Sequence, residues 1–472
     1  MEDMHPTLPE RIKSAPFTIE VVDPLALIKP TRLDYVLKHL YACSYYQRGK
    51  ALPWIRDLYA SFVRLMTGGI EPDRQTKFKI EDFMNAYDCL LEDIGTNGLD
   101  PESSVLPMNQ HLDLFDGSHR GMAAAALGLP VSAAKYQTDY SPTVCDWQYF
   151  KRQGIDSAWL EYLAARYVSL KRHECRLLFV DEKCTRLPKL LHRLRSTLNV
   201  IYLKRLAINN ARFTDFAREL ETQFNSNPEG ILDLLKGCKK KSDSLSLCVL
   251  ALEPKWNGPE TNLEQMFSNI PELRDAPHWS PSDTNTMIAM VQTFFNENSV
   301  FAAGRAHVAE CHKRIHRELK EEHAMKLDTV CITGETVVSV LCGRTVPRYE
   351  YIATNGFRPA GPGRELDPAQ TTPDGNKLIN IVTNPRCHFH HFGLKFATLT
   401  IVLQCQPNLK KTIDPVIRKS WARLQRKRWV RQQACFLVRP IVYTVKRTCR
   451  QLMPKRLEFY LYQFYMKSRR HK

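Results

Sequence analysis

The chain has 472 residues, 43% hydrophobic and 25% charged, a composition typical of a folded globular protein with several domains. No apolar run long enough for a transmembrane helix is present, Met1–Pro16 lacks the apolar core of a secretory signal, and no two of the 14 cysteines have the C-x-x-C spacing of a zinc ribbon or redox motif. We therefore expect a cytoplasmic protein whose cysteines are free thiols.

The positive charge is concentrated at the C-terminal end. The formal net charge is +17, and residues 410–472 contain 19 Lys and Arg against only Asp414 and Glu458. The preceding 409 residues are consequently balanced in charge. This distribution predicts a basic element appended to a neutral body.

Two short segments flank one glycine turn in the N-terminal third. Leu112–Phe115 is an apolar run that suits the end of a strand. Met122–Leu127 consists of strong helix formers, and Gly128 and Pro130 end the predicted helix.

The glycine turn reads Asp116-Gly117-Ser118-His119-Arg120. Glycine permits a tight turn before a helix, and the first N–H groups of a helix attract anions. Arg120 adds a guanidinium suited to phosphate, while Ser118 and His119 add further donors. The pattern predicts a phosphate-binding loop. The alternative is that Gly117 only makes a turn and Arg120 pairs with a nearby carboxylate.

The segment Ile80–Lys135 resembles the core of the ParB/sulfiredoxin superfamily, whose members bind nucleotides at the corresponding loop. In chain order, the resemblance implies an opening segment (Ile19–Pro24), inserted helices (33–78), a helix (Phe83–Leu99), a strand (Ser104–Met108), the loop with its helix, and a further strand (Leu129–Ala133). The resemblance implies that Gly117, Ser118, His119 and Arg120 bind the phosphates of ATP or CTP, with magnesium. Ser118 stands where sulfinic acid reductases of this superfamily need a cysteine, which argues against that reaction. No helix-turn-helix is evident after Lys135, which argues against a chromosome-partition protein.

The rest of the chain predicts two further domains and a tail. The middle region alternates strands (Arg176–Val180, Val200–Leu203, Leu245–Leu252) with helices (Leu187–Leu198, Phe213–Phe224, Gly230–Leu235), in the α/β manner. Further on, Ser282 or Asp283 is predicted to cap a helix that runs to about Asn296, and another helix is predicted at Ala306–Met325. The predicted fold class is therefore α/β, mixed with α+β. The predicted domains are residues 17–155, 156–281, 282–409 and 410–472.

The third domain resembles the nucleotidyltransferase fold. A strand ending at Thr333 leads through Gly334 into a helix, and a second strand follows at Tyr349–Ile352. Active members have a Gly-Ser turn and a pair of metal-binding carboxylates, but here Glu335 replaces the serine and Glu350 stands alone. The resemblance implies a degenerate, inactive unit. The histidines of the segment 388–391 suggest either metal ligands or a strand end, and we prefer the strand end because no second ligand cluster accompanies them.

In the tail, Trp421 and Trp429 lie among arginines, and Phe459–Met466 contains five aromatic residues. Basic residues interleaved with aromatic and aliphatic ones suit an anionic membrane surface, and we prefer that partner. Nucleic acid would suit the same mixture of charges and rings. A third possibility is a helical hairpin packed on the body, with its basic face outward.

Two functions of different class follow from these observations. The order of motifs resembles that of proteins associated with surface-polysaccharide synthesis. This implies a phosphoryl or nucleotidyl transferase at the inner membrane face, with Asp116 or Glu20 as its catalytic carboxylate. The alternative is a non-catalytic, nucleotide-gated protein that binds nucleic acid. Whether purified protein consumes nucleotide or only binds it separates the two.

Overall fold

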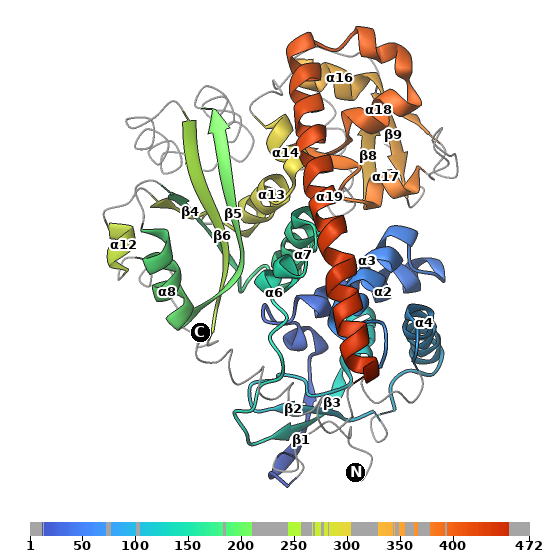
Figure 1. Cartoon of the computed structure of the whole chain (residues 1–472), viewed down its shortest axis with the longest axis vertical. Coiled ribbons are helices and arrows are strands. Elements are labelled where there is room, and N and C mark those ends of the chain that lie inside the picture. The colour runs from blue at the N-terminus through green and yellow to red at the C-terminus, as the bar shows by residue number, and fades with distance from the viewer. Residues whose placement is uncertain are drawn as a thin grey trace. The chain divides into compact units, whose positions relative to one another are not determined.

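The computed structural model has mixed α and β structure (Figure 1). It describes residues 12, 14–71, 77–100, 104–182, 186–209, 244–255, 267, 270–274, 278–281, 283–303, 329–342, 344, 349–354, 363–366, 378–391 and 394–452. The helices predicted within 213–235 and 306–325, and the aromatic cluster at 459–466, lie outside this part. The chain divides into two compact units, residues 1–156 with 432–472, and residues 157–431.

The first unit combines a three-stranded sheet with helices. Its elements are β1 (Phe17–Val22), η1 (Pro24–Leu27), α2 (Leu33–Arg48), α3 (Pro53–Thr67), α4 (Ile80–Asn97), β2 (Leu106–Asn109), α5 (Ser118–Leu127), β3 (Val131–Tyr136) and α6 (Trp147–Arg152). The strand order is β1-β3-β2, with β3 antiparallel to β1 and parallel to β2. The connection from β2 to β3 runs through α5, so the predicted glycine loop lies inside a βαβ unit.

The predicted helices and strands of this unit are present, with one correction. Leu112–Phe115 does not form the end of a strand. Leu112 has a φ of +63°, within a turn in which the Asn109 side chain accepts hydrogen bonds from the backbone of His111 and Asp113. Only an isolated bridge between Leu114 and Met108 resembles strand pairing. An apolar run this short carries no period, so its composition did not distinguish a strand from a turn.

The second unit contains a four-stranded sheet with strand order β5-β6-β4-β7. Its elements are α7 (Ser157–Leu170), β4 (Arg176–Asp181), α8 (Leu187–Thr197), β5 (Leu198–Asn209), β6 (Ser244–Pro254), α12 (Pro271–Arg274), β7 (His278–Trp279), α13 (Thr284–Phe294) and α14 (Glu297–Ala302). Asp283 caps α13 as predicted, since its carboxylate accepts a hydrogen bond from the backbone N–H of Thr286.

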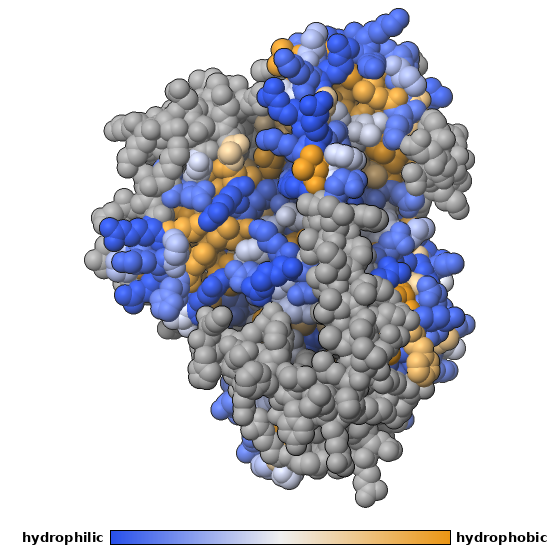
Figure 2. Space-filling view, viewed as in Figure 1, coloured by the Kyte–Doolittle hydropathy of each residue, from blue (hydrophilic) through white to orange (hydrophobic). Residues whose placement is uncertain are grey.

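The strand pairs of this sheet are all antiparallel over the described residues, which corrects the expected α/β alternation. Leu178 and Leu250 pack toward the leucines of α8, while Phe179 on the opposite face contacts Phe294 of α13. Strands that are buried on both faces have continuous apolar sequences whether they pair in parallel or antiparallel. The composition of these strands therefore did not indicate their direction relative to one another. Figure 2 shows hydrophobic residues over the part of this sheet next to α8.

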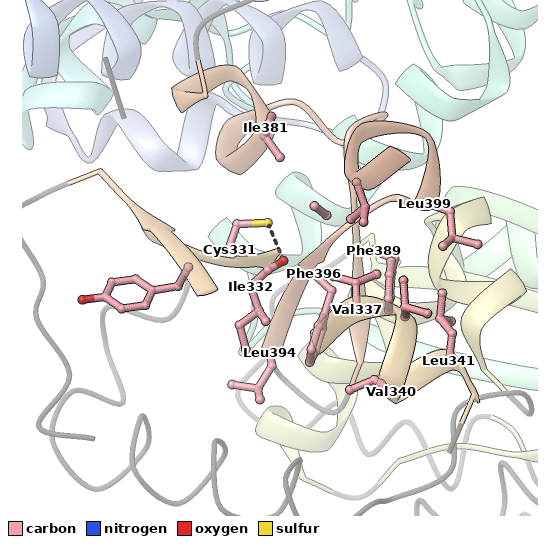
Figure 3. Packing of buried hydrophobic residues seen from close by; sticks show 14 of the residues in the cluster. Cys331, Ile332, Val337, Val340, Leu341, Ile381, Phe389, Leu394, Phe396 and Leu399 are labelled. Carbon is pink, nitrogen blue, oxygen red and sulfur yellow. Dashed lines mark hydrogen bonds between the residues drawn. The ribbon is translucent and has the colours of Figure 1, made fainter. Parts of the chain in front are cut away.

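A five-stranded mixed sheet, β10-β9-β8-β12-β11, follows in the second unit. Its elements are β8 (Val330–Thr333), α16 (Glu335–Cys342), β9 (Tyr349–Ala353), β10 (Gly363–Glu365), α17 (Ile379–Thr383), β11 (His388–His391), β12 (Leu394–Ala397), α18 (Leu399–Cys405) and η3 (Pro407–Lys411). Figure 3 shows its core, in which Ile332 of β8 and Phe396 of β12 lie beside Val337 of α16. The predicted order of strand, Gly334 turn, helix and strand is present.

Helix α19 (Pro415–Leu452) forms the described part of the tail. Ile413, Ile417 and Trp421 are buried in the core of the five-stranded sheet, and the Trp421 indole N–H donates to Thr400 Oγ1 at 3.1 Å. Every helix in the part of the chain that the structure describes is too short or too polar to span a bilayer.

Candidate phosphate-binding site

The loop Asp116–Arg120 leads into helix α5, whose N-terminus has no side-chain cap. Gly117 is the N-cap of α5 and has a φ of +74°, a conformation that side chains other than glycine adopt at a cost. A Cβ atom on Gly117 would lie 2.5 Å from Leu106 Cδ2, and Leu106 is buried. The first turn of α5 carries no acidic residue. Glycine is therefore required here, and the N–H groups at the start of α5 have no acidic neighbour within that turn.

Three cationic or hydroxyl donors converge on this helix start. The Arg120 side chain folds back over Gly117, so that a Cβ there would lie 3.1 Å from Arg120 Nη2. The ammonium of Lys38, on α2, donates to Ser118 Oγ at 2.8 Å. The Arg120 guanidinium thus lies beside the turn. Lys38 is a further candidate ligand, and it comes from the inserted helices.

A buried ion network holds Lys38 in place. Asp34 is 1% exposed, accepts two hydrogen bonds of 2.9 Å from the Arg32 guanidinium, and lies 3.2 Å from Lys38 Nζ. Burial lowers the pKa of Lys38, while the Asp34 carboxylate opposes that shift. Two cations therefore share one carboxylate in a poorly solvated environment. An incoming anion would supply the charge that this network lacks.

His119 is positioned as a neutral side chain. Burial lowers its pKa well below the ordinary value, and the positive charge of Lys38 adds to that shift. Its Nε2 lies 2.8 Å from the hydroxyl of Tyr59, and its ring lies 4.6 Å from that of Tyr87. His119 therefore contributes packing and hydrogen bonding at neutral pH, and the positive charge of the site comes from Lys38, Arg32 and Arg120.

The two candidate catalytic carboxylates differ in position. Asp116 precedes the N-cap of α5 and is half-buried beside the loop. Glu20 lies on the edge strand β1, opposite Ala133, where it is paired with Lys135 at 3.2 Å and accepts a hydrogen bond from Thr18. Those two hydrogen bonds lower the pKa of Glu20. Among the described residues, no hydrogen bond or ion pair joins Glu20 to the loop, whereas Asp116 belongs to the loop itself.

Lys38 and Asp34 were not predicted as site residues, because they lie in the segment 33–78 that was interpreted as an insertion. Their spacing in the sequence nevertheless indicates that they interact. Asp34 and Lys38 are spaced i, i+4 on a helix whose neighbouring residues are mostly apolar or aromatic. Two opposite charges at that spacing on a buried face indicate a structural or functional ion pair.

The second glycine turn, at Gly334, is already occupied by a carboxylate of the protein. A Cβ on Gly334 would overlap Glu350 Oε2, and the same oxygen accepts a hydrogen bond of 2.8 Å from Gln406. Arg364 Nη1 lies 3.7 Å from the other carboxylate oxygen. Gln406 and Arg364 thus hold Glu350 against the start of α16.

Glu350→Gln is expected to leave any nucleotide turnover by the protein, and its magnesium dependence, as in the wild type. Glutamine retains an oxygen that can accept from Gln406, and the partners of Glu350 are protein side chains. Turnover measured with and without MgCl2, beside a circular-dichroism check of folding, tests this. Lost turnover in a folded variant would show that Glu350 takes part in the reaction.

His388, the first histidine of the segment 388–391, is engaged by the backbone. His388 is 2% exposed and its Nδ1 lies 3.0 Å from the carbonyl oxygen of Ile381. Burial lowers its pKa well below the ordinary value. The histidines lie on β11, in agreement with the preferred interpretation of a strand end. The structure groups no three metal-ligand side chains among the residues it describes.

Comparisons of the chain with protein-family models, with curated proteins and with solved structures return no match.

Proposed function

We propose that the first unit binds a nucleotide through its phosphates at the start of α5. The observation that carries the proposal is the approach of Lys38 Nζ to Ser118 Oγ, at 2.8 Å, beside a helix start without a side-chain cap. Backbone N–H groups, a hydroxyl, an ammonium and the Arg120 guanidinium form a complementary set for phosphate oxygens.

The reaction proposed at this site is phosphoryl or nucleotidyl transfer with ATP or CTP and magnesium. Positive groups around the phosphates stabilise the charge that develops during such a transfer. Asp116, adjacent to the phosphate-binding turn, is the residue proposed to accept the proton of the attacking group or to help hold magnesium. The acceptor proposed is a glycan precursor, as the resemblance to polysaccharide-associated proteins implies.

Arg120→Ala is expected to weaken nucleotide binding by about 10- to 150-fold, the equivalent of losing one charge-assisted hydrogen bond of roughly 1.5–3 kcal/mol. Lys38→Met should weaken binding similarly. Arg152→Ala is the matched control, because Arg152 is an exposed arginine of α6 in the same unit. Isothermal titration of ATP and CTP with MgCl2 measures the dissociation constants.

Equal affinities for wild type, Arg120→Ala and Lys38→Met, with all three folded, would contradict the phosphate site. The same preparations, assayed for nucleotide consumption, test the transfer step separately. If the protein binds nucleotide but does not consume it in the presence of glycan acceptors, the result would contradict a transferase and support a non-catalytic, nucleotide-gated protein.

A further inference from the structure

The first four turns of α19 have one buried face and one exposed face. Ile413, Ile417 and Trp421 anchor the helix in the core of the five-stranded sheet. On the same side, Arg428 Nε lies 3.0 Å from Glu297 Oε2, and Arg431 Nη1 lies 2.6 Å from Glu297 Oε1. Burial acts to raise the pKa of Glu297, but these arginines outweigh it and lower that pKa to about 2. The orientation of the helix about its own axis is therefore defined.

This orientation turns a basic stripe outward. At 3.6 residues per turn, positions spaced i, i+3, i+7, i+10, i+11 and i+14 share one face, here the face opposite the buried anchors. The residues of the basic stripe, all exposed, are Val416, Lys419, Arg423, Arg426, Lys427 and Val430. They extend over roughly 21 Å of helix axis. The described part of α19 is correspondingly mostly hydrophilic in Figure 2.

The stripe has an unbalanced charge. No acidic residue occurs between Pro415 and Leu452. Two acidic side chains contact these turns among the described residues. Asp414 accepts hydrogen bonds from the backbone N–H groups of Val416 and Ile417. Glu297 is bound by Arg428 and Arg431, which do not belong to the stripe. Four cations therefore face outward together, and a surface that complements them must be negatively charged.

The apolar members of the exposed surface distinguish between anionic partners. Val416 is 64% exposed and Val430 is 55% exposed, at the two ends of the stripe, and the neighbouring Trp429 is 60% exposed. Aliphatic side chains gain free energy by entering the acyl boundary of a bilayer, and tryptophan favours the headgroup level. The phosphate backbone of a nucleic acid offers no comparable apolar phase for valine.

We propose that the basic stripe of α19 docks the protein on the surface of an anionic phospholipid membrane. Lys419, Arg423, Arg426 and Lys427 bind lipid phosphate and carboxylate groups, while Val416, Val430 and Trp429 enter the interface. The helix lies in the plane of the membrane, with its other face fixed on the protein. This inference is independent of nucleotide binding by the first unit.

Partition of the full-length protein onto vesicles tests the proposal. Vesicles of phosphatidylcholine with one quarter phosphatidylserine are compared with pure phosphatidylcholine, without nucleotide. Arg423→Gln combined with Lys427→Gln is expected to lower the partition coefficient onto anionic vesicles roughly 30-fold, about fivefold per cation. The control is Lys189→Gln combined with Arg193→Gln, two exposed cations of α8 in the same unit, which removes equal charge and should leave partition near the wild-type value.

A second variant separates membrane from nucleic acid. Val416→Ser with Val430→Ser keeps every charge, and is expected to lower vesicle partition severalfold while leaving gel-shift affinity for DNA and RNA unchanged. Three results would overturn the proposal: no preference of the wild type for anionic vesicles, an equal loss in the α8 control, or wild-type binding to nucleic acid without vesicle binding. Circular dichroism shows that each variant is folded.

Discussion

Lys204→Met is expected to lower the free energy of unfolding of the second unit by about 3–5 kcal/mol, because it breaks a buried ion pair and leaves one charge without a partner. Lys204 Nζ donates to Glu161 Oε2 at 2.6 Å, and the two side chains are 8% and 5% exposed. Burial raises the pKa of Glu161, and the Lys204 ammonium opposes that shift. Removing the lysine removes this opposition.

The loss of unfolding free energy in Lys204→Met should depend on pH. A carboxyl group whose folded pKa lies above its unfolded value binds its proton more tightly in the folded state, so its contribution to stability falls as pH rises from about 4.5 through the folded pKa. Without Lys204, Glu161 should be protonated over a wider range. Urea unfolding should therefore show a larger difference between Lys204→Met and wild type at pH 8 than at pH 5.

The double variant Glu161→Leu, Lys204→Met is the control for the ion pair. Replacing a buried pair by apolar side chains of similar size is often neutral or stabilising, so the double variant should recover most of the stability lost in Lys204→Met. Additive losses in the single variants and the double variant would show that the two residues stabilise the unit independently.

The sequence predicted the local structure of both units well, since its signals are local. Gly128, after the alanine-rich helix, takes the left-handed conformation that ends α5, and Asp283 caps α13. The sheets were harder. Phe179 and Val249 lie in continuous apolar strands, and burial on both faces removes the alternation that would reveal direction or register.

The candidate site was predicted in part for a similar reason. Gly117, Ser118 and Arg120 are adjacent in sequence, so a turn-and-helix pattern identified them. Lys38 lies 80 residues before Ser118 and reaches it only through the packing of α2 against α5. No local pattern states which long-range contact a helix makes. The i, i+4 spacing of Asp34 and Lys38 indicates a buried ion pair, but it does not indicate which other element of the chain the pair contacts.

Asp34→Asn is expected to destabilise the first unit by about 3–5 kcal/mol, because it leaves the charges of Arg32 and Lys38 buried together without their carboxylate. Burial acts to raise the pKa of Asp34, but the charges and hydrogen bonds of Arg32 and Lys38 outweigh it and lower that pKa well below its usual range. The stabilisation is therefore present above the unfolded pKa of about 4 and is lost as pH falls toward the folded pKa. Unfolding free energies of wild type and variant should converge in acid.

The same variant connects the stability of the unit to the proposed phosphate site. Without Asp34, the two cations lack a negative partner that a bound phosphate group can supply. ATP or CTP with MgCl2 should therefore raise the melting temperature of Asp34→Asn more than that of the wild type, because a ligand that binds only the folded state stabilises it according to its affinity. Inorganic phosphate at high concentration should act in the same direction, more weakly. An equal shift in both proteins would mean that the ligand binds away from Lys38. A destabilised variant with no shift from any of the three ligands would mean that the network is purely structural, and that the positive charge beside α5 only secures the packing of α2.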